Sequence, residues 1–305
     1  MTRFIARRLG AILLISLAIV LFCSFALRLL GQPSGTGQSG LLGLVRQSFS
    51  DAAHFWAQLF SGNLGTVTQR VGRRQVYVSV SSVLLDTYTK SMGLLTASML
   101  LAVTLGIGLG VLSAIWEGSP LSLLLLNTSI LGTSMPTFFL ALLLQVIEIT
   151  WYQRTGVRLV PVGGFGWDSH LILPALVLCV RPLAQLARIT LVALSEVAHQ
   201  DYVRTAWAKG LAPSSIWAGH IVPNAMVSLL TAIGVSLRFS LGSLPVVEYF
   251  FGWPGLGARL LDAISRRQAG LVIPLALALG LTFMLINLAL EVAYRMADPQ
   301  LREQL

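Results

Sequence analysis

The chain has 305 residues, of which 55% are hydrophobic and only 11% charged, and its formal net charge is +9. A soluble globular protein carries about 25% charged residues, so this composition excludes a large soluble core and indicates a chain dissolved in lipid. The basic residues are scattered along the sequence, which argues against a nucleic-acid-binding protein and is explained by the cationic loops of a membrane protein.

Six apolar runs are long enough to cross the membrane, because about 20 helical residues span about 30 Å of hydrocarbon. They cover residues 9–30, 92–116, 121–147, 171–195, 227–247 and 270–293. We therefore predict an all-α polytopic membrane protein with six transmembrane helices.

Small residues and prolines mark particular positions within these runs. Gly106, Gly108 and Gly110 are expected to let a neighbouring helix approach closely. Four prolines interrupt or enter the spans, and they either kink them to allow motion or are static: Pro136, Pro182, Pro245 and Pro274.

A long loop, residues 31–91, separates the first two spans. It begins with a Gly/Ser/Pro-rich stretch, 32–40. Further on, Val76, Val78 and Val80 alternate with more polar residues, which suits a short strand or an extended lead into the second span.

The distribution of basic residues predicts how the chain is oriented in the membrane, although by a narrow margin. Arg3, Arg7 and Arg8 precede the first span and Arg28 follows it, which places the N-terminus, 1–8, on the cytosolic side. Six spans then bring the C-terminus, residues 294–305, to the same side. With this topology the short cytosolic segments hold seven basic residues and the short external loops five.

Several common catalytic and nucleotide motifs are missing from the sequence. A phosphate-binding P-loop requires GxxxxGK[ST], but Lys90 follows Thr89 and Lys209 precedes Gly210, and these are the only lysines. There is no GxSxG and no HExxH motif. Cys23 and Cys179 lie inside apolar runs and are interpreted as packing residues. We expect no enzymatic activity, no metal site and no cofactor in the chain, and any ATP-dependent step belongs to a partner.

The ionisable residues at membrane depth are mostly cationic: Glu148, Arg181, Arg188 and Arg238. They favour an anion-accepting path or helix-to-helix pairing over acid/base chemistry. An alternative, a self-sufficient secondary transporter, needs inverted repeats and coupling-ion carboxylates near the midplane. The sequence shows no clear repeat and a single deep carboxylate, Glu148.

A polar loop, residues 196–225, lies between the fourth and fifth spans. We predict a helix from Glu196 to about Lys209, a stop at Gly210, and a second helix starting near Pro213 with Ser214 or Ser215 near its cap. Such a helix–turn–helix either presents a contact surface to another protein or caps the helix bundle.

The order of residues in this loop resembles the EAA loop of ABC-importer permeases. Arg204-Thr205-Ala206 is followed by Gly210 and then by His220-Ile221-Val222-Pro223. "QDYVRTAWAKGL" is similar to the dipeptide/oligopeptide permease family. Further segments match that family in order: "RFIARRLG", "GNLG", "GTSMPTFFLALLL", "LVPVGG", "HLILPALVL", "VVEYFFGWPGLGARLLDAI" and "DPQLR". The opening segment, the long first loop and "FGWPGLG" resemble the B-type subunit more than the C-type.

The resemblance implies a type I ABC-importer permease fold in a bacterial inner membrane. It implies a second, different permease as partner, together with two cytosolic ATPase domains, separate or fused, that bind ATP and Mg. A binding protein outside the cytosol would deliver the substrate.

The resemblance also assigns residues. Those at the ATPase contact are Tyr202, Arg204, Ala206, Lys209, Gly210 and Leu211. For the translocation path or gate it indicates Pro136, Phe138, Glu248, Trp253 and Gly255, to which we add Arg188 and Arg238 because of their charge at membrane depth. The 248–269 segment is expected to be an outer gate, or alternatively an interfacial aromatic belt.

Departures from the family pattern leave the cargo open among dipeptides, oligopeptides, nickel and glutathione. They include Trp207, Pro223, Asp86 and the pair Arg181-Pro182. Arg188 and Arg238, if they face the path, favour a carboxylate-bearing cargo such as a peptide.

Overall fold

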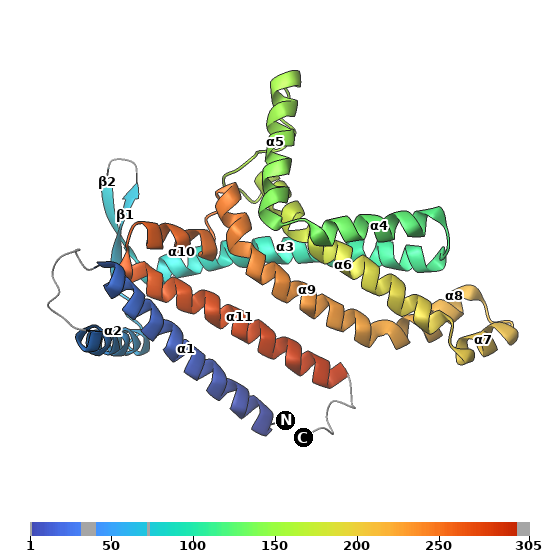
Figure 1. Ribbon diagram of the computed structural model, residues 1–305, viewed down its shortest axis with the longest axis horizontal. Helices are drawn as coiled ribbons and strands as arrows, with labels where there is room; N and C mark the ends of the chain where they lie inside the picture. Colours follow the sequence, from blue (N-terminus) through green and yellow to red (C-terminus); the bar gives the residue numbers. More distant parts are fainter. Residues whose placement is uncertain (1, 32–40, 72–73, 298–305) are drawn as a thin grey trace. The chain divides into compact units, whose positions relative to one another are not determined.

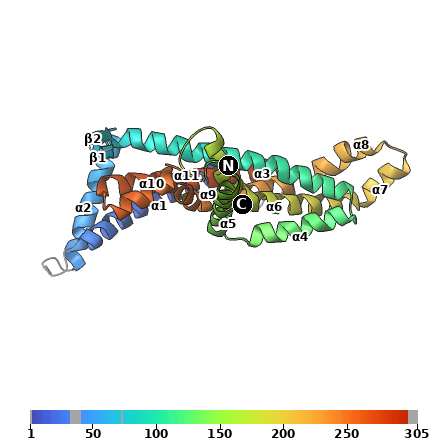
Figure 2. The same ribbon diagram turned by 90° about the horizontal axis from the view of Figure 1, so that it is seen from above.

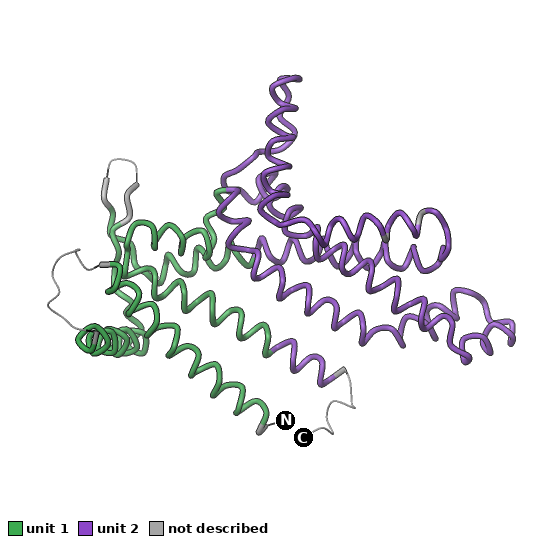
Figure 3. Tube along the Cα trace, in the orientation of Figure 1, with its two compact units in different colours: residues 1–92, 252–288 green, residues 93–251, 289–305 purple. Residues whose placement is uncertain are grey.

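The computed structural model describes residues 2–31, 41–71 and 74–297 of the chain (Figure 1). The chain divides into two compact units (Figure 3). Unit 1 comprises Met1–Met92 and Gly252–Leu288, and unit 2 comprises Gly93–Phe251 and Ala289–Leu305. The predicted Gly/Ser/Pro-rich stretch 32–40 and the closing "DPQLR" motif lie outside the described residues.

Unit 1 combines helices with one β-hairpin. Its elements are α1 (Thr2–Gly31), α2 (Leu41–Phe60), β1 (Thr66–Val71), β2 (Arg74–Ser79), the first part of α3 (Val80–Ile115), α10 (Leu256–Ser265) and most of α11 (Ala269–Ala297). The strands are antiparallel, with Thr66 opposite Ser79. One core cluster joins Val80 and Val83 of α3 to Leu256 of α10 and Leu271 of α11.

Unit 2 is helical throughout its described part. It contains the rest of α3, α4 (Pro120–Ser134), α5 (Thr137–Thr155), the 3₁₀ turn η1 (Ser169–Leu171), α6 (Ile172–Ala198), α7 (Asp201–Ala208), α8 (Pro213–Ile216), the π-helical turn η2 (Trp217–Ile221), α9 (Val222–Phe251) and the end of α11. Helices α6 and α9 run side by side in both views (Figures 1 and 2).

Five described helical segments are long and apolar enough to cross a membrane: 4–30, 80–115, 169–198, 213–251 and 269–296. The third predicted span, 121–147, is instead a pair of helices, α4 and α5, bent by 104°. The bend has a local cause at Pro136, which lacks an N–H and restricts the residue before it to extended conformations. Met135 is accordingly extended, with ψ 125°. Six spans are reached only if this bent pair counts as one. The helices continue through the other three prolines, which lie inside α6, α9 and α11.

The predicted glycine contacts are confirmed at two positions and wrong at the third. A Cβ on Gly106 would lie 2.8 Å from the backbone oxygen of Leu183, and one on Gly110 would lie 2.5 Å from Cβ of Thr190. Both contacts are with α6. A Cβ on Gly108 meets nothing within 4 Å, because position 108 points away from the face that 106 and 110 share.

The segment predicted as a loop, 31–91, contains regular structure. Helix α2 and the β-hairpin occupy much of it. The expected strand around Val76 and Val78 is confirmed as β2, but Val80 already begins α3. Hydropathy alone missed this first part of α3 because its residues are mixed in polarity, and their buried face against α10 and α11 stabilises the helix.

Candidate functional site

The 196–225 loop starts with a break that the sequence reading missed. We predicted one helix to about Lys209, but α6 ends at Ala198 and α7 begins at Asp201. Gln200 between them is extended, with φ −70° and ψ 149°. The break lets α7 turn back onto the ends of the long helices, so the loop is a folded element of unit 2.

One face of the loop is buried. Val203 and Ala206 of α7, together with Ile216 and Ile221, form a cluster with Leu191 and Leu194 of α6, Ala114 of α3 and Ala225 of α9. Burial of large aliphatic side chains contributes about 1.5–3 kcal/mol each, so this cluster fixes the loop to the helix ends. Ala206, predicted as a contact residue, lies on this buried side, where its small side chain lets α7 approach the bundle.

The other face of the loop is exposed. Tyr202, Trp207 and Leu211 are 46%, 46% and 39% exposed. Arg204, Lys209 and Gly210 are exposed as well, and the Arg204–Asp201 pair at 3.6 Å is a surface contact. Five of the six residues predicted at the ATPase contact therefore lie on the accessible surface. Trp207 was noted only as a departure from the family pattern, yet it shares this exposed surface. An aromatic residue in an otherwise polar loop is the sequence signal that could have predicted its place on this exposed surface.

Gly210 has the backbone conformation that only glycine adopts easily. Its φ is +75°, and a Cβ there would meet nothing within 4 Å. Its N–H donates to the carbonyl of Trp207 at 2.9 Å, which ends α7. The predicted stop at Gly210 is confirmed. The second helix predicted to start near Pro213 is confirmed as α8. Ala212 is its N-cap and Pro213 takes the first helical position, where its missing N–H costs nothing, so Ser214 and Ser215 lie next to the cap.

The loop rejoins the long helices through η2. The N–H of Val222 donates to the carbonyl of Trp217, one residue further back than in an α-helix. Pro223 follows directly and cannot donate a hydrogen bond, so a widened turn at this point relieves the missing contact. The loop and α9 therefore form one continuous helical path from Pro213 to Phe251.

The 252–265 segment is fastened to α3 within unit 1. The indole N–H of Trp253 donates to the carbonyl of Lys90 at 3.0 Å, and the N–H of Leu256 donates to Oγ of Ser91 at 2.7 Å. Trp253 and Leu256 are 0% exposed. Gly255 is buried and extended just before α10. The aromatic-belt alternative does not describe Trp253, since its ring is buried inside the unit.

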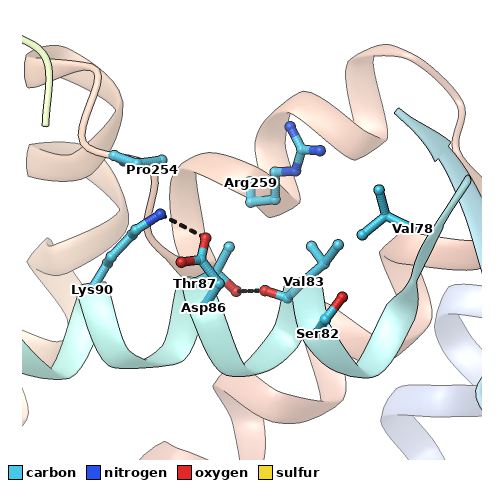
Figure 4. Close-up of a pocket in the computed structure, with 8 residues that line it drawn as sticks. All are labelled: Val78, Ser82, Val83, Asp86, Thr87, Lys90, Pro254 and Arg259. Carbon is cyan, nitrogen blue, oxygen red and sulfur yellow. Dashed lines mark hydrogen bonds and ion pairs between the residues drawn. The ribbon is translucent and has the colours of Figure 1, made fainter. Parts of the chain in front are cut away.

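A cavity of about 350 Å³ lies beside this segment (Figure 4). It is lined by Val78, Ser82, Val83, Asp86, Thr87, Lys90, Pro254 and Arg259. Nζ of Lys90 lies 2.6 Å from Oδ2 of Asp86, and Arg259 pairs with Asp262 at 3.4 Å. Both basic side chains thus face an acidic partner, so the cavity does not favour anions by charge alone.

The other predicted path residues are spread over three helices of unit 2. Pro136 and Phe138 are exposed at the start of α5, Arg188 is exposed on α6, and Arg238 is half-buried on α9, where Glu248 is fully buried. They line neither the cavity beside Lys90 nor a second one between α3 and α6, at Leu101 and Ala175. Their role in a path stays a prediction.

Two of the deep charged residues have a packing role in the structure. The guanidinium carbon of Arg181 lies 3.6 Å from the ring centroid of Phe239, which joins α6 to α9 by a cation–π contact. Oε1 of the buried Glu148 accepts the backbone N–H groups of Leu159 and Val160 at 2.8 and 3.3 Å. Helix pairing and loop anchoring thus account for these two charges.

The comparisons with known proteins decide the family. Residues 106–303 match the model of the binding-protein-dependent transport system inner membrane component. The chain belongs to this family. The matched region includes the entire 196–225 loop.

Two curated relatives extend the match over the chain. The di/tripeptide transport system permease protein DppB of Pseudomonas aeruginosa is 32% identical over 343 aligned residues and all of both chains. The glutathione transport system permease protein GsiC of Pectobacterium atrosepticum is 32% identical over 98% of each chain.

A solved structure supports the fold. The inward-facing MetNI methionine ABC transporter superposes with a TM-score of 0.56 at 17% identity, covering 72% of this chain and 97% of that one. The predicted type I ABC-importer permease fold is confirmed. The protein is a multi-pass membrane permease subunit of an ABC importer, a class that works with an ATPase and a binding protein.

Proposed function

We propose that the chain imports di- or oligopeptides delivered by a binding protein, as one half of a heterodimer with a second permease. ATP and Mg are bound by two partner ATPase domains, because the sequence contains no P-loop. The relative named as a di/tripeptide permease, aligned over the whole chain, supports this cargo.

The observation that carries the coupling role is the two-sided 196–225 loop. Its exposed side presents Tyr202, Trp207 and Leu211, and an exposed apolar patch of this kind is typical of a protein contact. Its buried side joins the ends of α3, α6 and α9 through one cluster. Because packed interiors transmit displacement, a partner that moves the loop moves these helices with it.

The loop also supports an orientation of the chain in the membrane. An ATPase contact requires the 196–225 loop to face the cytosol, in the bacterial inner membrane. The basic residues Arg7 and Arg8 before the first span favour the same side for the N-terminus. Counting the bent α4–α5 pair as one span then places the C-terminus in the cytosol too.

The test uses the assembled transporter in proteoliposomes with two matched substitutions. Gly210→Arg places a long side chain on the exposed loop. Gly118→Arg does the same at an open turn of similar φ, +77°, between α3 and α4. We expect both variants to insert, and only Gly210→Arg to lose uptake while the complex retains ATPase subunits with uncoupled hydrolysis. Normal uptake by Gly210→Arg would refute the coupling role.

A second cargo, glutathione, is favoured by one observation, the equally similar GsiC relatives. Both cargoes carry carboxylates, which suits Arg188 and Arg238 if they face the path. Competition between a dipeptide and glutathione for uptake by the same proteoliposomes distinguishes the two cargoes. Equal transport of either cargo by wild type and Arg238→Ala would remove Arg238 from the path.

A further inference from the structure

Helix α2 crosses the end of α1 within unit 1. Figure 1 shows α2 almost end-on while α1 runs across the page, and Figure 2 shows α2 along its length. Arg28 of α1 donates from Nε and Nη2 to the two carboxylate oxygens of Asp51, at 2.5 and 2.7 Å, and from Nη1 to Gln47 at 2.8 Å. A bidentate pair fixes orientation as well as distance, so it holds α2 at one position along the length of α1.

The sequence of α2 forms three stripes at helical spacing. The first is buried and consists of Leu44, Ser48, Ala52 and Phe55; Ala52 and Phe55 pack with Val20 of α1 and Leu277 of α11. The second is exposed and polar: Gln47, Ser50, His54 and Gln58. The third is exposed and mostly apolar: Leu42, Arg46, Phe49, Ala53, Ala57 and Phe60.

The third stripe is too apolar for a surface in water. Leu42, Phe49 and Phe60 are 86%, 56% and 82% exposed. The last residues of α1, Leu29 and Leu30, are exposed as well. Because α1 has the length and composition of a membrane span, its exposed leucines face lipid, and α2, which is bound to Arg28 at the end of this span, lies at the same membrane surface.

The position along α1 at which α2 is bound coincides with the expected edge of the bilayer's hydrocarbon core. About 20 residues cross the hydrocarbon, and counting from Leu9, just after Arg8, this length ends at Arg28. Arg28 is the residue that binds α2. Within the third stripe, Arg46 lies on the side next to the polar stripe, the position from which a long basic side chain reaches lipid phosphates.

We propose that α2 is an interfacial helix that binds phospholipid in the leaflet at the C-terminal end of α1. Leu42, Phe49 and Phe60 insert among the acyl chains, and Arg46 contacts phosphate. The polar stripe faces water. In this position the helix resists movement of α1 along the membrane normal, because sinking would bury the polar stripe in hydrocarbon and rising would expose the apolar one.

The test is a depth measurement on the assembled transporter in phosphatidylcholine/phosphatidylglycerol vesicles. Spin labels are placed at single cysteines in a Cys23→Ser, Cys179→Ser background, which removes the two free cysteines. The variants are Phe49→Cys and Phe60→Cys, with Ser50→Cys and Gln58→Cys as matched controls from the polar stripe. Labels at 49 and 60 should relax faster with oxygen than with an aqueous nickel chelate, and labels at 50 and 58 should show the reverse.

Equal access of the nickel chelate at positions 49 and 50 would overturn the proposal. Protection of position 49 only after the binding protein is added would overturn it too, since the stripe would then be a protein-docking surface. A second measurement compares Phe49→Asp with Ser50→Asp. A charge inserted among acyl chains is costly, so the yield of intact complex should fall about threefold or more for Phe49→Asp alone, and equal yields would contradict lipid insertion.

Discussion

The indole of Trp253 donates a hydrogen bond to the backbone carbonyl of Lys90, 163 positions earlier in the chain, at 3.0 Å. This contact attaches the 252–265 segment to α3 where a second bond, from Leu256 to Ser91, does the same. The family resemblance assigned this segment to a gate. The structure shows how it is held, by two polar contacts among fully buried side chains.

Trp253→Phe should weaken this attachment. The smaller phenyl ring leaves a void, and the Lys90 carbonyl loses its donor, which by itself costs about 1–3 kcal/mol at a buried position. We expect a lower unfolding temperature of the solubilised complex and slower uptake. Trp151→Phe, at a ring that is about half exposed, is the control and should change neither; an equal loss from both variants would remove the special role of Trp253.

Gly106→Ala and Gly110→Ala should separate α3 from α6. The new Cβ atoms would lie 2.8 and 2.5 Å from atoms of α6, and overpacking of this kind costs about 1–3 kcal/mol. Gly108→Ala adds the same methyl group into open space and should be neutral or slightly stabilising. Thermal unfolding of the three variants in one detergent checks the order, and destabilisation by Gly108→Ala as large as by the others would contradict it.

Glu148→Gln should support uptake close to that of the wild type. The amide oxygen of glutamine can accept the N–H groups of Leu159 and Val160 as the carboxylate does. Glu148→Leu removes the acceptor and should destabilise the loop by about 1 kcal/mol or more. ATP-dependent uptake by both variants is the measurement. Loss of uptake in Glu148→Gln would instead point to a proton- or ion-coupling carboxylate.

The contribution of Asp168 to stability should depend on pH in one direction. Hydrogen bonds from the backbone N–H and ring of His170 lower the pKa of Asp168 from its ordinary value of 3.8. A carboxyl group with a lowered folded pKa stabilises the fold above its unfolded pKa, and this effect is lost as the pH falls through the folded value. The difference in melting temperature between wild type and Asp168→Ala should therefore be constant from about pH 5 to 7 and shrink below about pH 4. A difference that grows on acidification would be inconsistent with this.

Hydropathy and local motifs in the sequence were sufficient to predict most of the spans, the end of α7 and the family. A membrane span needs only a continuous apolar stretch, so five of the six predicted spans follow from local composition, whereas the 104° bend of the remaining one was not predicted. The stop at Gly210 follows from a property of one residue, its tolerance of positive φ. The family match over residues 106–303 agrees with the motifs around the loop.

Other features depended on contacts between distant residues, which no local pattern encodes. The same glycine spacing gives a close contact at Gly106 and none at Gly108, because only the position of α6 decides which side of α3 is covered. Ala206 faces inward because α7 turns back at Gln200 onto α6. Helix α2 was hidden in a mixed-polarity loop, since its folding depends on burial against α1 and α11 and on the pair between Arg28 and Asp51. The sequence by itself determined which segments are apolar enough to cross a membrane and which loop carries the family's motif; the tertiary structure decided which face of each helix is buried, because burial depends on a neighbour that lies far away in the chain.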